Sequence, residues 1–183
     1  MKQIQVRLKD GTVVLGDEFD LNDLKKLQDI FRKWKNINGD LKELGGRNLN
    51  VPDVFSEALF CIYFDSVRTN GTAYSYDAVN KKTGEGIQIK SASIPNDCTS
   101  FGPESTWDKL YFVDFAPNGY IDGNVWFYEI ESDSIYDLVL NESKHETFKQ
   151  QQLQGRRPRF SIKNRIIKEN NLKPIKKINL LEV

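Results

Sequence analysis

YSYDAVNKKTGEGIQIKSAS, residues 74–93, is the stretch of sequence that decides the fold. Residues that favour strands stand on both sides of a short polar segment with two glycines, so the stretch predicts two strands joined by a tight turn. Pairing the strands about the gap between Lys82 and Thr83 places Asp77 opposite Gln88. The hairpin therefore brings these two positions together.

The second strand of this hairpin has a polar face and an apolar face. Since strand side chains alternate, Gln88 and Lys90 share one face, and Ile87 and Ile89 share the other. With Asp77 on the neighbouring strand, one side of the sheet offers a carboxylate, an amide oxygen and an ammonium group. Such a trio can hold a hard divalent cation and a water molecule beside a phosphate. The alternative is a surface hairpin whose polar face has no chemical role.

Length and composition indicate one compact domain, residues 1–183. The chain has 39% hydrophobic residues and no internal repeat, and a chain of this length can bury most of its apolar surface. No apolar run approaches the roughly 20 residues that span a bilayer, and the N-terminus lacks the apolar segment of a signal peptide. We therefore expect a cytoplasmic protein without membrane contact.

Too few cysteines and histidines are present for a disulfide framework or a Cys/His zinc site. Cys61 and Cys98 are the two cysteines, and His145 is the single histidine. We expect both thiols to be reduced and partly buried. The polar surroundings of His145 argue against a catalytic histidine.

The net charge is zero, but the charges are unevenly distributed. Residues 97–142 contain ten acidic residues and one basic residue, whereas residues 144–177 contain eleven basic and two acidic residues. This basic segment is a candidate surface for phosphate contacts. The alternative is a solvated basic helix.

Two elements are expected at the N-terminus. Residues 2–8 and 12–15 flank a turn and predict a small hairpin. Apolar residues at three- and four-residue steps then predict an amphipathic helix that Asp20 caps and that ends near Asn38 and Gly39.

A second, largely apolar helix is predicted to begin around Val51-Pro52-Asp53 and to continue to Phe64. It carries Glu57 at the edge of its main apolar face. A carboxylate in such a helix is costly unless it is paired or coordinates a cation, so Glu57 is a candidate metal or water ligand facing the hairpin. The alternative is a partly exposed glutamate at the rim.

Two further strands and a helix are expected after the hairpin. Residues 107–115 predict a central strand, and residues 124–130 predict the next one. Ser132 or Ser134 is then expected to cap a helix that includes residues 136–140.

Two long polar segments, residues 95–106 and 147–160, are candidate DNA-reading loops. After the second, Ser161 is expected to cap a basic helix, Ile162–Lys168. Arginine and glutamine are residue types that reach guanine and adenine edges, or phosphates on the way there. The candidate DNA contacts are Ser100, Glu104, Ser105, Gln152, Gln154, Arg156, Arg157 and Arg159.

The order of Glu57, Asp77 and Gln88-Ile89-Lys90 resembles that of the PD-(D/E)XK nuclease superfamily. A more specific likeness lies in three runs: IQIKSASI at 87–94, TSFGP at 99–103 and WDKLYFVDF at 107–115. Together with the chain length, these look like the small type II restriction endonucleases of the Bsp-six-I type, which cut within an interrupted GC…GC site.

This resemblance covers most of the chain from about residue 40 onward, and the first forty residues add little to it. It implies an α/β fold with a mixed β-sheet flanked by helices, and a homodimer that hydrolyses phosphodiester bonds of double-stranded DNA at a palindromic site with Mg²⁺. It further implies a prokaryotic cytoplasm and a cognate DNA methyltransferase encoded by a neighbouring gene.

The resemblance also implies roles for individual residues. Asp77, Glu57 and Gln88, with the backbone carbonyl of Ile89, would hold Mg²⁺, and Lys90 would orient or activate the attacking water. Gln88 stands where the superfamily usually has glutamate. An amide oxygen can ligate a cation but brings no charge, so the two carboxylates would carry the electrostatics of the site.

Three functions remain open at this point. They are a sequence-specific type II endonuclease, a junction-resolving or repair nuclease with the same core, and a catalytically inactive DNA-binding relative. The two polar segments exceed what a reader of backbone shape needs, which favours base readout. An inactive relative would leave the presence of both Asp77 and Lys90 without explanation.

Overall fold

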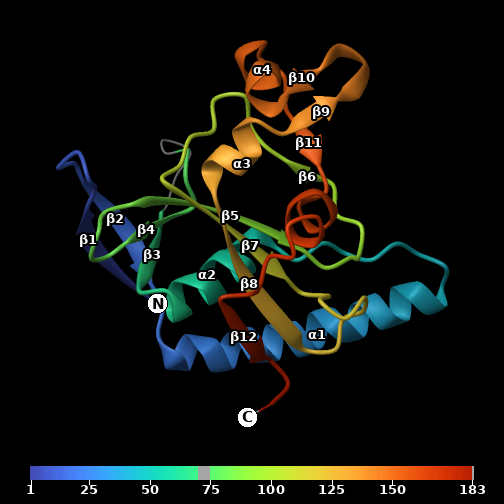
Figure 1. Cartoon of the computed structure of the whole chain (residues 1–183). Coiled ribbons are helices and arrows are strands. Elements are labelled where there is room, and N and C mark those ends of the chain that lie inside the picture. Colours follow the sequence, from blue (N-terminus) through green and yellow to red (C-terminus); the bar gives the residue numbers. More distant parts are fainter. Residues whose placement is uncertain (70–74, 183) are drawn as a thin grey trace.

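A computed structural model describes residues 1–69 and 75–182 of the chain. Within these residues, eight strands form one mixed sheet in the order β1-β2-β3-β4-β5-β7-β8-β12 (Figure 1). Neighbouring strands are antiparallel except for β5 and β7, which are parallel. The α/β fold with a mixed sheet is therefore confirmed. The strands of the sheet are β1 (Lys2–Arg7), β2 (Val13–Glu18), β3 (Ser66–Thr69), β4 (Ala78–Asn80), β5 (Gly86–Ala92), β7 (Lys109–Asp114), β8 (Asn124–Ile130) and β12 (Lys176–Asn179).

Helices and short strands cover both faces of this sheet. On one face, α1 (Leu21–Glu43) and α2 (Asp53–Tyr63) form a core with β5, β7 and β8. The other core contains residues of α3 (Ser132–Tyr136), α4 (Phe148–Leu153) and the π-helical turn η2 (Lys163–Lys168). The remaining elements are β6 (Thr99–Ser100), β9 (Val139–Asn141), η1 (Glu142–Lys144), β10 (Glu146–Thr147) and β11 (Arg159–Phe160). No helix in the described part of the chain has the length and apolar character needed to cross a membrane.

The predicted central hairpin is present with the predicted register. Ala78 pairs with Ile87 and Val79 with Gly86, which is pairing about the gap between residues 82 and 83. Ile87 and Ile89 of β5 pack into the core under α1 and α2, as the alternation predicts. Tyr74, the first residue of the predicted hairpin, lies outside the described residues.

The turn of this hairpin packs closely against the N-terminal hairpin. Gly84 has a φ of +70°, and a Cβ atom there would lie 2.6 Å from the backbone oxygen of Arg7. The Lys9 backbone N–H donates to the Gly84 oxygen at 3.2 Å. A residue with a side chain would be both strained and excluded at this position, so the turn requires glycine.

Both N-terminal elements are confirmed, but the predicted end of α1 is wrong. Asp20 caps α1 in a capping box with Asp23. The helix passes Gly39 and ends only at Glu43, before Gly45 with its φ of +74°. The buried Asn38 amide donates to the Trp34 carbonyl oxygen at 2.8 Å, which stabilises the helix where the pattern predicted its end.

The strands predicted at 107–115 and 124–130 are present as β7 and β8, whereas the helix predicted after them is mostly wrong. α3 ends at Tyr136, and residues 139–141 form β9, which pairs with β10. Neither serine caps α3: its N-cap is Glu131, and the Ser132 hydroxyl accepts a hydrogen bond from the Trp107 indole at 3.1 Å. The apolar residues here belong to two short elements, α3 and β9, and their spacing also fits a single helix.

The segment 95–106 is held by the C-terminal tail. β6 within this segment pairs with β11. The buried Asp97 accepts hydrogen bonds from the Ser161 hydroxyl at 2.6 Å and from the backbone N–H groups of Ile162 and Lys163 at 2.8 and 3.1 Å. Ser161 also accepts from the Asn164 N–H at 3.1 Å, so it caps the turn that follows, as predicted. We call this arrangement the Asp97 clamp.

A buried ion pair supports the clamp. The Lys163 ammonium lies 2.8 Å from Asp114 at the end of β7 and 2.9 Å from the Ala116 carbonyl oxygen. Burial raises the pKa of Asp114, while the Lys163 charge beside it lowers it. The pair ties the turn η2 to the centre of the sheet.

Candidate active site

A cavity of about 500 Å³ opens between the start of α2, the edge of the central hairpin and the segment that follows β5. It is lined by Asp53, Ser56 and Glu57 from α2, by Asp77, Ile89 and Lys90 from the hairpin, and by residues 91–94 and 97–100. The structure therefore brings Glu57, Asp77 and Lys90 to one cleft. The hairpin supplies its floor, and the Asp97 clamp holds its outer wall.

Asp77 lies directly before β4, where its side chain faces β5. Its Oδ2 atom accepts a hydrogen bond from the Ile89 N–H at 2.7 Å and a very short one from the Gln88 amide. The Asp77 N–H donates to the Ile87 oxygen at 2.8 Å, which continues the ladder past the end of β4. These contacts hold the carboxylate at the edge of the cavity.

The charge of Asp77 is only partly compensated. Burial raises the pKa of its carboxyl group from the ordinary value of 3.8 to about 6. The Ile89 hydrogen bond and the Lys90 charge lower this pKa, whereas Glu57 and Asp53 raise it by repulsion. A carboxylate in this setting gains from a cation placed beside it.

Two uncharged oxygen donors lie next to Asp77. The N–H and C=O groups of a strand residue point to the same edge, so the Ile89 carbonyl faces the side on which Asp77 accepts the Ile89 N–H. Gln88 is buried, with 4% of its surface exposed, and its amide nitrogen contacts Asp77. Rotation of this amide by half a turn presents its oxygen to the same place.

Lys90 follows on the same strand and lines the cavity. Its ammonium group lies 5.3 Å from the centre of the Phe101 ring, in the distance range of a cation–π contact. Phe101 is fully buried, so the ring provides a rigid surface beneath the ammonium. The strand thus places a positive charge within the cleft that holds Asp77.

Glu57 is buried, contrary to the alternative of a glutamate at an exposed rim. Its Oε2 atom lies 2.5 Å from Arg68 Nε, an ion pair between α2 and β3. Arg68 Nη1 lies 3.9 Å from Asp17 on β2. A carboxylate in this apolar helix therefore has the charged partner that its burial requires.

The sequence patterns missed three of these charged residues: Asp17, Asp53 and Arg68. Asp53 lies one helical turn before Glu57, and this four-residue spacing is the signal that could have indicated it. Asp17 and Arg68 meet Glu57 only because three separate elements pack together.

The donor set fits a hard cation. Mg²⁺ prefers oxygen ligands, and the cleft offers the Asp77 carboxylate, the Ile89 carbonyl and the Gln88 amide. Among the described residues, no three His, Cys, Asp or Glu side chains are grouped to hold a metal ion. An ion here would therefore rely on uncharged oxygens as well as carboxylates.

The predicted DNA contacts differ in how they are placed. Gln152 is buried and donates to the Gly102 and Ser105 carbonyl oxygens at 2.9 and 3.3 Å, so it holds the loop that contains Ser105. Gln154 and Arg156 both bind the Glu146 carboxylate. Ser100 lines the cavity and its hydroxyl oxygen is buried, whereas the side chains of Glu104, Arg157 and Arg159 are exposed.

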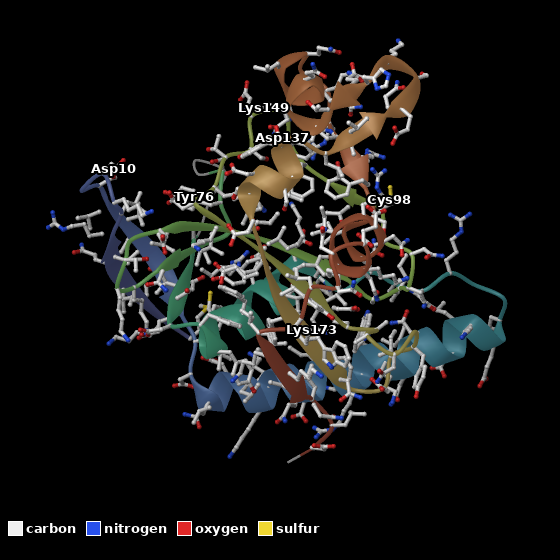
Figure 2. The ribbon with its side chains drawn as sticks, in the orientation of Figure 1. Asp10, Tyr76, Cys98, Asp137, Lys149 and Lys173 are labelled. Atoms are coloured by element: carbon white, nitrogen blue, oxygen red, sulfur yellow. The ribbon has the colours of Figure 1, made fainter. Side chains whose placement is uncertain are left out.

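The cysteines and the histidine are not among these oxygen donors, although Cys98 lines the cavity. Cys61 is buried within α2, and Cys98 is free but exposed, where partial burial was expected. Figure 2 labels Cys98 beside the turn η2, at the outer wall of the cleft. His145 is exposed, with a φ of +49°, next to η1.

The mixed sheet with helices on its faces is consistent with a nuclease-like α/β fold. Residues 19–169 match the model of the Bsp6I restriction endonuclease family. A relative, the type II restriction enzyme Bsp6I of Bacillus sp. (strain RFL6), is 35% identical over 150 residues, which are 80% of this chain and 82% of that protein. The chain belongs to the Bsp6I restriction endonuclease family. No solved structure matches it.

This membership decides among the three functions left open by the sequence. The protein is a site-specific deoxyribonuclease of the restriction type, and DNA is its substrate. A divalent metal ion is the cofactor consistent with that class and with the oxygen donors of the cleft.

Proposed function

We propose that the protein uses Mg²⁺ to hydrolyse phosphodiester bonds of double-stranded DNA within an interrupted GC…GC site. The observation that carries this proposal is the partly compensated carboxylate of Asp77, held beside the Ile89 carbonyl in a cleft that also contains Lys90. A bound Mg²⁺ would supply Lewis-acid activation of the phosphate.

The residues of the cleft have distinct roles in this proposal. Asp77 holds the cation with the Ile89 carbonyl and the Gln88 amide oxygen, and Glu57 adds negative charge nearby. Lys90 orients the attacking water and stabilises the charge that develops on the phosphate. The attacking water gives up a proton to the surrounding water as its oxygen bonds to phosphorus. The bond from phosphorus to the leaving sugar oxygen breaks, and that oxygen takes a proton from the surrounding water.

The direct test is cleavage of a plasmid that carries several GC…GC sites with different spacings. Purified protein should produce discrete fragments with Mg²⁺ and none with EDTA. Fragments at unrelated positions would reject the proposed site, and the absence of Mg²⁺-dependent cleavage would reject the proposed cofactor.

Gln88→Glu should lower the Mg²⁺ concentration needed for half-maximal cleavage, because a carboxylate binds the ion more strongly than an amide does. The added charge would lie against Asp77, so the metal-free variant should also unfold at a lower temperature than the parent. Mg²⁺ should then raise its unfolding temperature more than that of the parent. Metal titrations of cleavage and of thermal unfolding measure both effects.

Gln5→Glu is a matched control for this experiment, because it introduces the same charge on an exposed residue of β1 that does not line the cleft. It should leave the Mg²⁺ dependence unchanged. If Gln88→Glu also leaves that dependence unchanged, Gln88 does not contact the ion.

For DNA recognition we propose that the segments 95–106 and 147–160 approach the major groove and that η2 contacts phosphates or a second protomer. Pairing between β6 and β11 supports a joint role for the two segments, since it sets them side by side. Ser100, Glu104 and Ser105 belong to the first segment, and the glutamines and arginines listed above belong to the second.

Arg157→Ala and Arg159→Ala should each weaken DNA binding, because both side chains are exposed on the proposed surface. Loss of a bidentate guanine contact should cost about 1–3 kcal/mol with cognate DNA only. Loss of a phosphate contact should weaken binding to all DNA and reduce the salt slope by roughly one unit. Binding to cognate and random duplexes at several salt concentrations separates the two.

Arg156→Ala is the third variant of the series. Arg156 differs from the other two arginines because it is paired with Glu146 within the protein. We expect its effect on binding to be smaller than those of Arg157→Ala and Arg159→Ala. If all three variants bind and discriminate as the parent does, the tail is a solvated surface and base readout lies elsewhere.

We further propose a homodimer, since a palindromic site presents the same contacts to two copies of one chain. An endonuclease of this kind endangers its own host unless the host protects its DNA. We therefore expect a neighbouring gene for a DNA methyltransferase of the same specificity, and a site of action in the prokaryotic cytoplasm.

A further inference from the structure

Arg68 connects the candidate metal site to the neighbouring strands. Its position on β3 lies opposite Ala78 of β4, the residue that follows Asp77. Its Nε atom lies 2.5 Å from Glu57 and its Nη1 atom 3.9 Å from Asp17. The guanidinium group therefore lies between two carboxylates of different elements, beside the cleft.

Both carboxylates depend on this guanidinium. The side chains of Glu57 and Asp17 are 11% and 6% exposed, so little water is available to solvate their charges. Among the described residues, Asp17 Oδ1 has no hydrogen-bond partner, so Arg68 is the charge that compensates this buried group. An arginine stays charged at every ordinary pH and provides a planar set of donors for carboxylates.

The ion pair with Arg68 limits what Glu57 can bind. The carboxylates that line the cavity are Asp53, Glu57, Asp77 and Asp97. Asp97 accepts hydrogen bonds from the tail and Glu57 is paired with Arg68, which leaves Asp53 and Asp77 to face a cation in the cleft. A second divalent ion beside Glu57 would have to displace the guanidinium or share the carboxylate with it at close range, where like charges repel.

We propose that Arg68 is a positioning residue that takes the place of a second divalent cation, so that the site binds one metal ion at Asp77. This inference rests on the proposed function, which assigns a metal ion to Asp77. The carboxylate of Glu57 is then paired with the Arg68 guanidinium, which is always charged. This ion pair fixes the position of the Glu57 charge relative to the cleft. Asp17 holds the far side of the guanidinium.

The test counts Mn²⁺ ions bound to the whole protein, by the loss of the electron paramagnetic resonance signal of free Mn²⁺. The parent should bind one Mn²⁺ at the cleft, whereas Arg68→Met should bind two, because Glu57 is then released to accept an ion. Arg68→Lys, which restores a positive charge, should bind one. Arg32→Met is the matched control, since Arg32 forms a surface ion pair with Asp29 on α1; it should bind one.

A second variant keeps the test independent of how well Arg68→Met folds. Glu57→Gln should still bind one Mn²⁺, because the ion is held at Asp77, and the double variant Glu57→Gln/Arg68→Met should also bind one. Two ions on the parent, loss of the ion in Glu57→Gln, or one ion on a folded Arg68→Met would each overturn the inference.

Failure of the proposed function has a different signature. If Asp77→Asn binds as many Mn²⁺ ions as the parent, the assignment of a metal ion to Asp77 is wrong. If Asp77→Asn loses the ion but Arg68→Met gains none, the metal site at Asp77 is supported and the role proposed for Arg68 is wrong.

Discussion

Asp77→Asn should slow DNA cleavage by at least about 1000-fold, which corresponds to about 4 kcal/mol of lost transition-state stabilisation. The amide keeps the shape of the side chain, and its oxygen can still accept the Ile89 N–H. The negative charge that holds the cation is lost. Rates measured with excess enzyme over cognate DNA, across a range of Mg²⁺ concentrations, separate this loss from a weaker affinity for the ion.

The same variant should be more stable than the parent in the absence of metal. The pKa of Asp77 is raised to about 6 in the folded protein, so folding favours the protonated form. The cost of the charge is absent below pH 3.8, grows between pH 3.8 and 6, and is fully present above pH 6. At pH 8 without metal, removal of the charge should stabilise the fold by about 3 kcal/mol, since a shift of about two pKa units is involved, which raises the unfolding temperature by roughly 6–12 °C.

Asp29→Asn provides the control, because Asp29 is exposed on α1. It should cleave DNA as the parent does and gain no stability at pH 8. An Asp77→Asn protein that still cleaves at a tenth of the parental rate would remove Asp77 from the catalytic site. An unfolding temperature below that of the parent at pH 8 would show that its hydrogen bonds matter more than its buried charge.

Lys90→Ala should reduce the rate of cleavage by about 100- to 1000-fold, the effect typical of removing one group that stabilises charge in a transition state. Binding to cognate DNA should change little, because the role proposed for Lys90 is in the chemical step. Calcium ions in place of Mg²⁺ allow binding to be measured while cleavage is suppressed. Single-turnover rates with Mg²⁺ then measure the chemical step.

Lys82→Ala is a matched control on the same hairpin, where Lys82 lies at the turn with 82% of its side chain exposed. It should leave both rate and binding unchanged. If Lys90→Ala loses binding and cleavage in equal proportion, Lys90 acts in holding DNA, and the attacking water is oriented by another group.

The hairpin at the centre of the site was predictable because its information is local. A turn and a period-two pattern decide which residues face each other, and slipping by one residue would place the isoleucines of β5 on the polar side. The positions of Asp77, Gln88 and Lys90 follow from that register alone. Capping residues such as Asp20 and Ser161 were likewise predictable from their immediate neighbours.

The charged surroundings of Glu57 were not predictable in this way. Its partner Arg68 is eleven residues away, and a second pair links Arg68 to Asp17 on another strand. Nothing in the spacing of these residues indicates a contact, because α2, β2 and β3 meet only when the sheet is assembled. The two errors in helix boundaries have the same origin: a tertiary hydrogen bond to Leu49 engages Asn38 within α1, and β10 pairs with residues that fit a helical pattern.

The Asp97 clamp can form only late in the synthesis of the chain, because its donors lie at residues 161–163. The N-terminal hairpin, α1, α2 and the central hairpin are synthesised well before Ser161, Ile162 and Lys163, which donate to Asp97. Proteins begin to fold while they are being synthesised, from the N-terminus onward. A nascent chain can therefore assemble the strands that carry Asp77 and Lys90, yet the wall of its cleft has no support until the tail emerges. Prematurely terminated chains should thus be harmless to the chromosome of the cell that makes them.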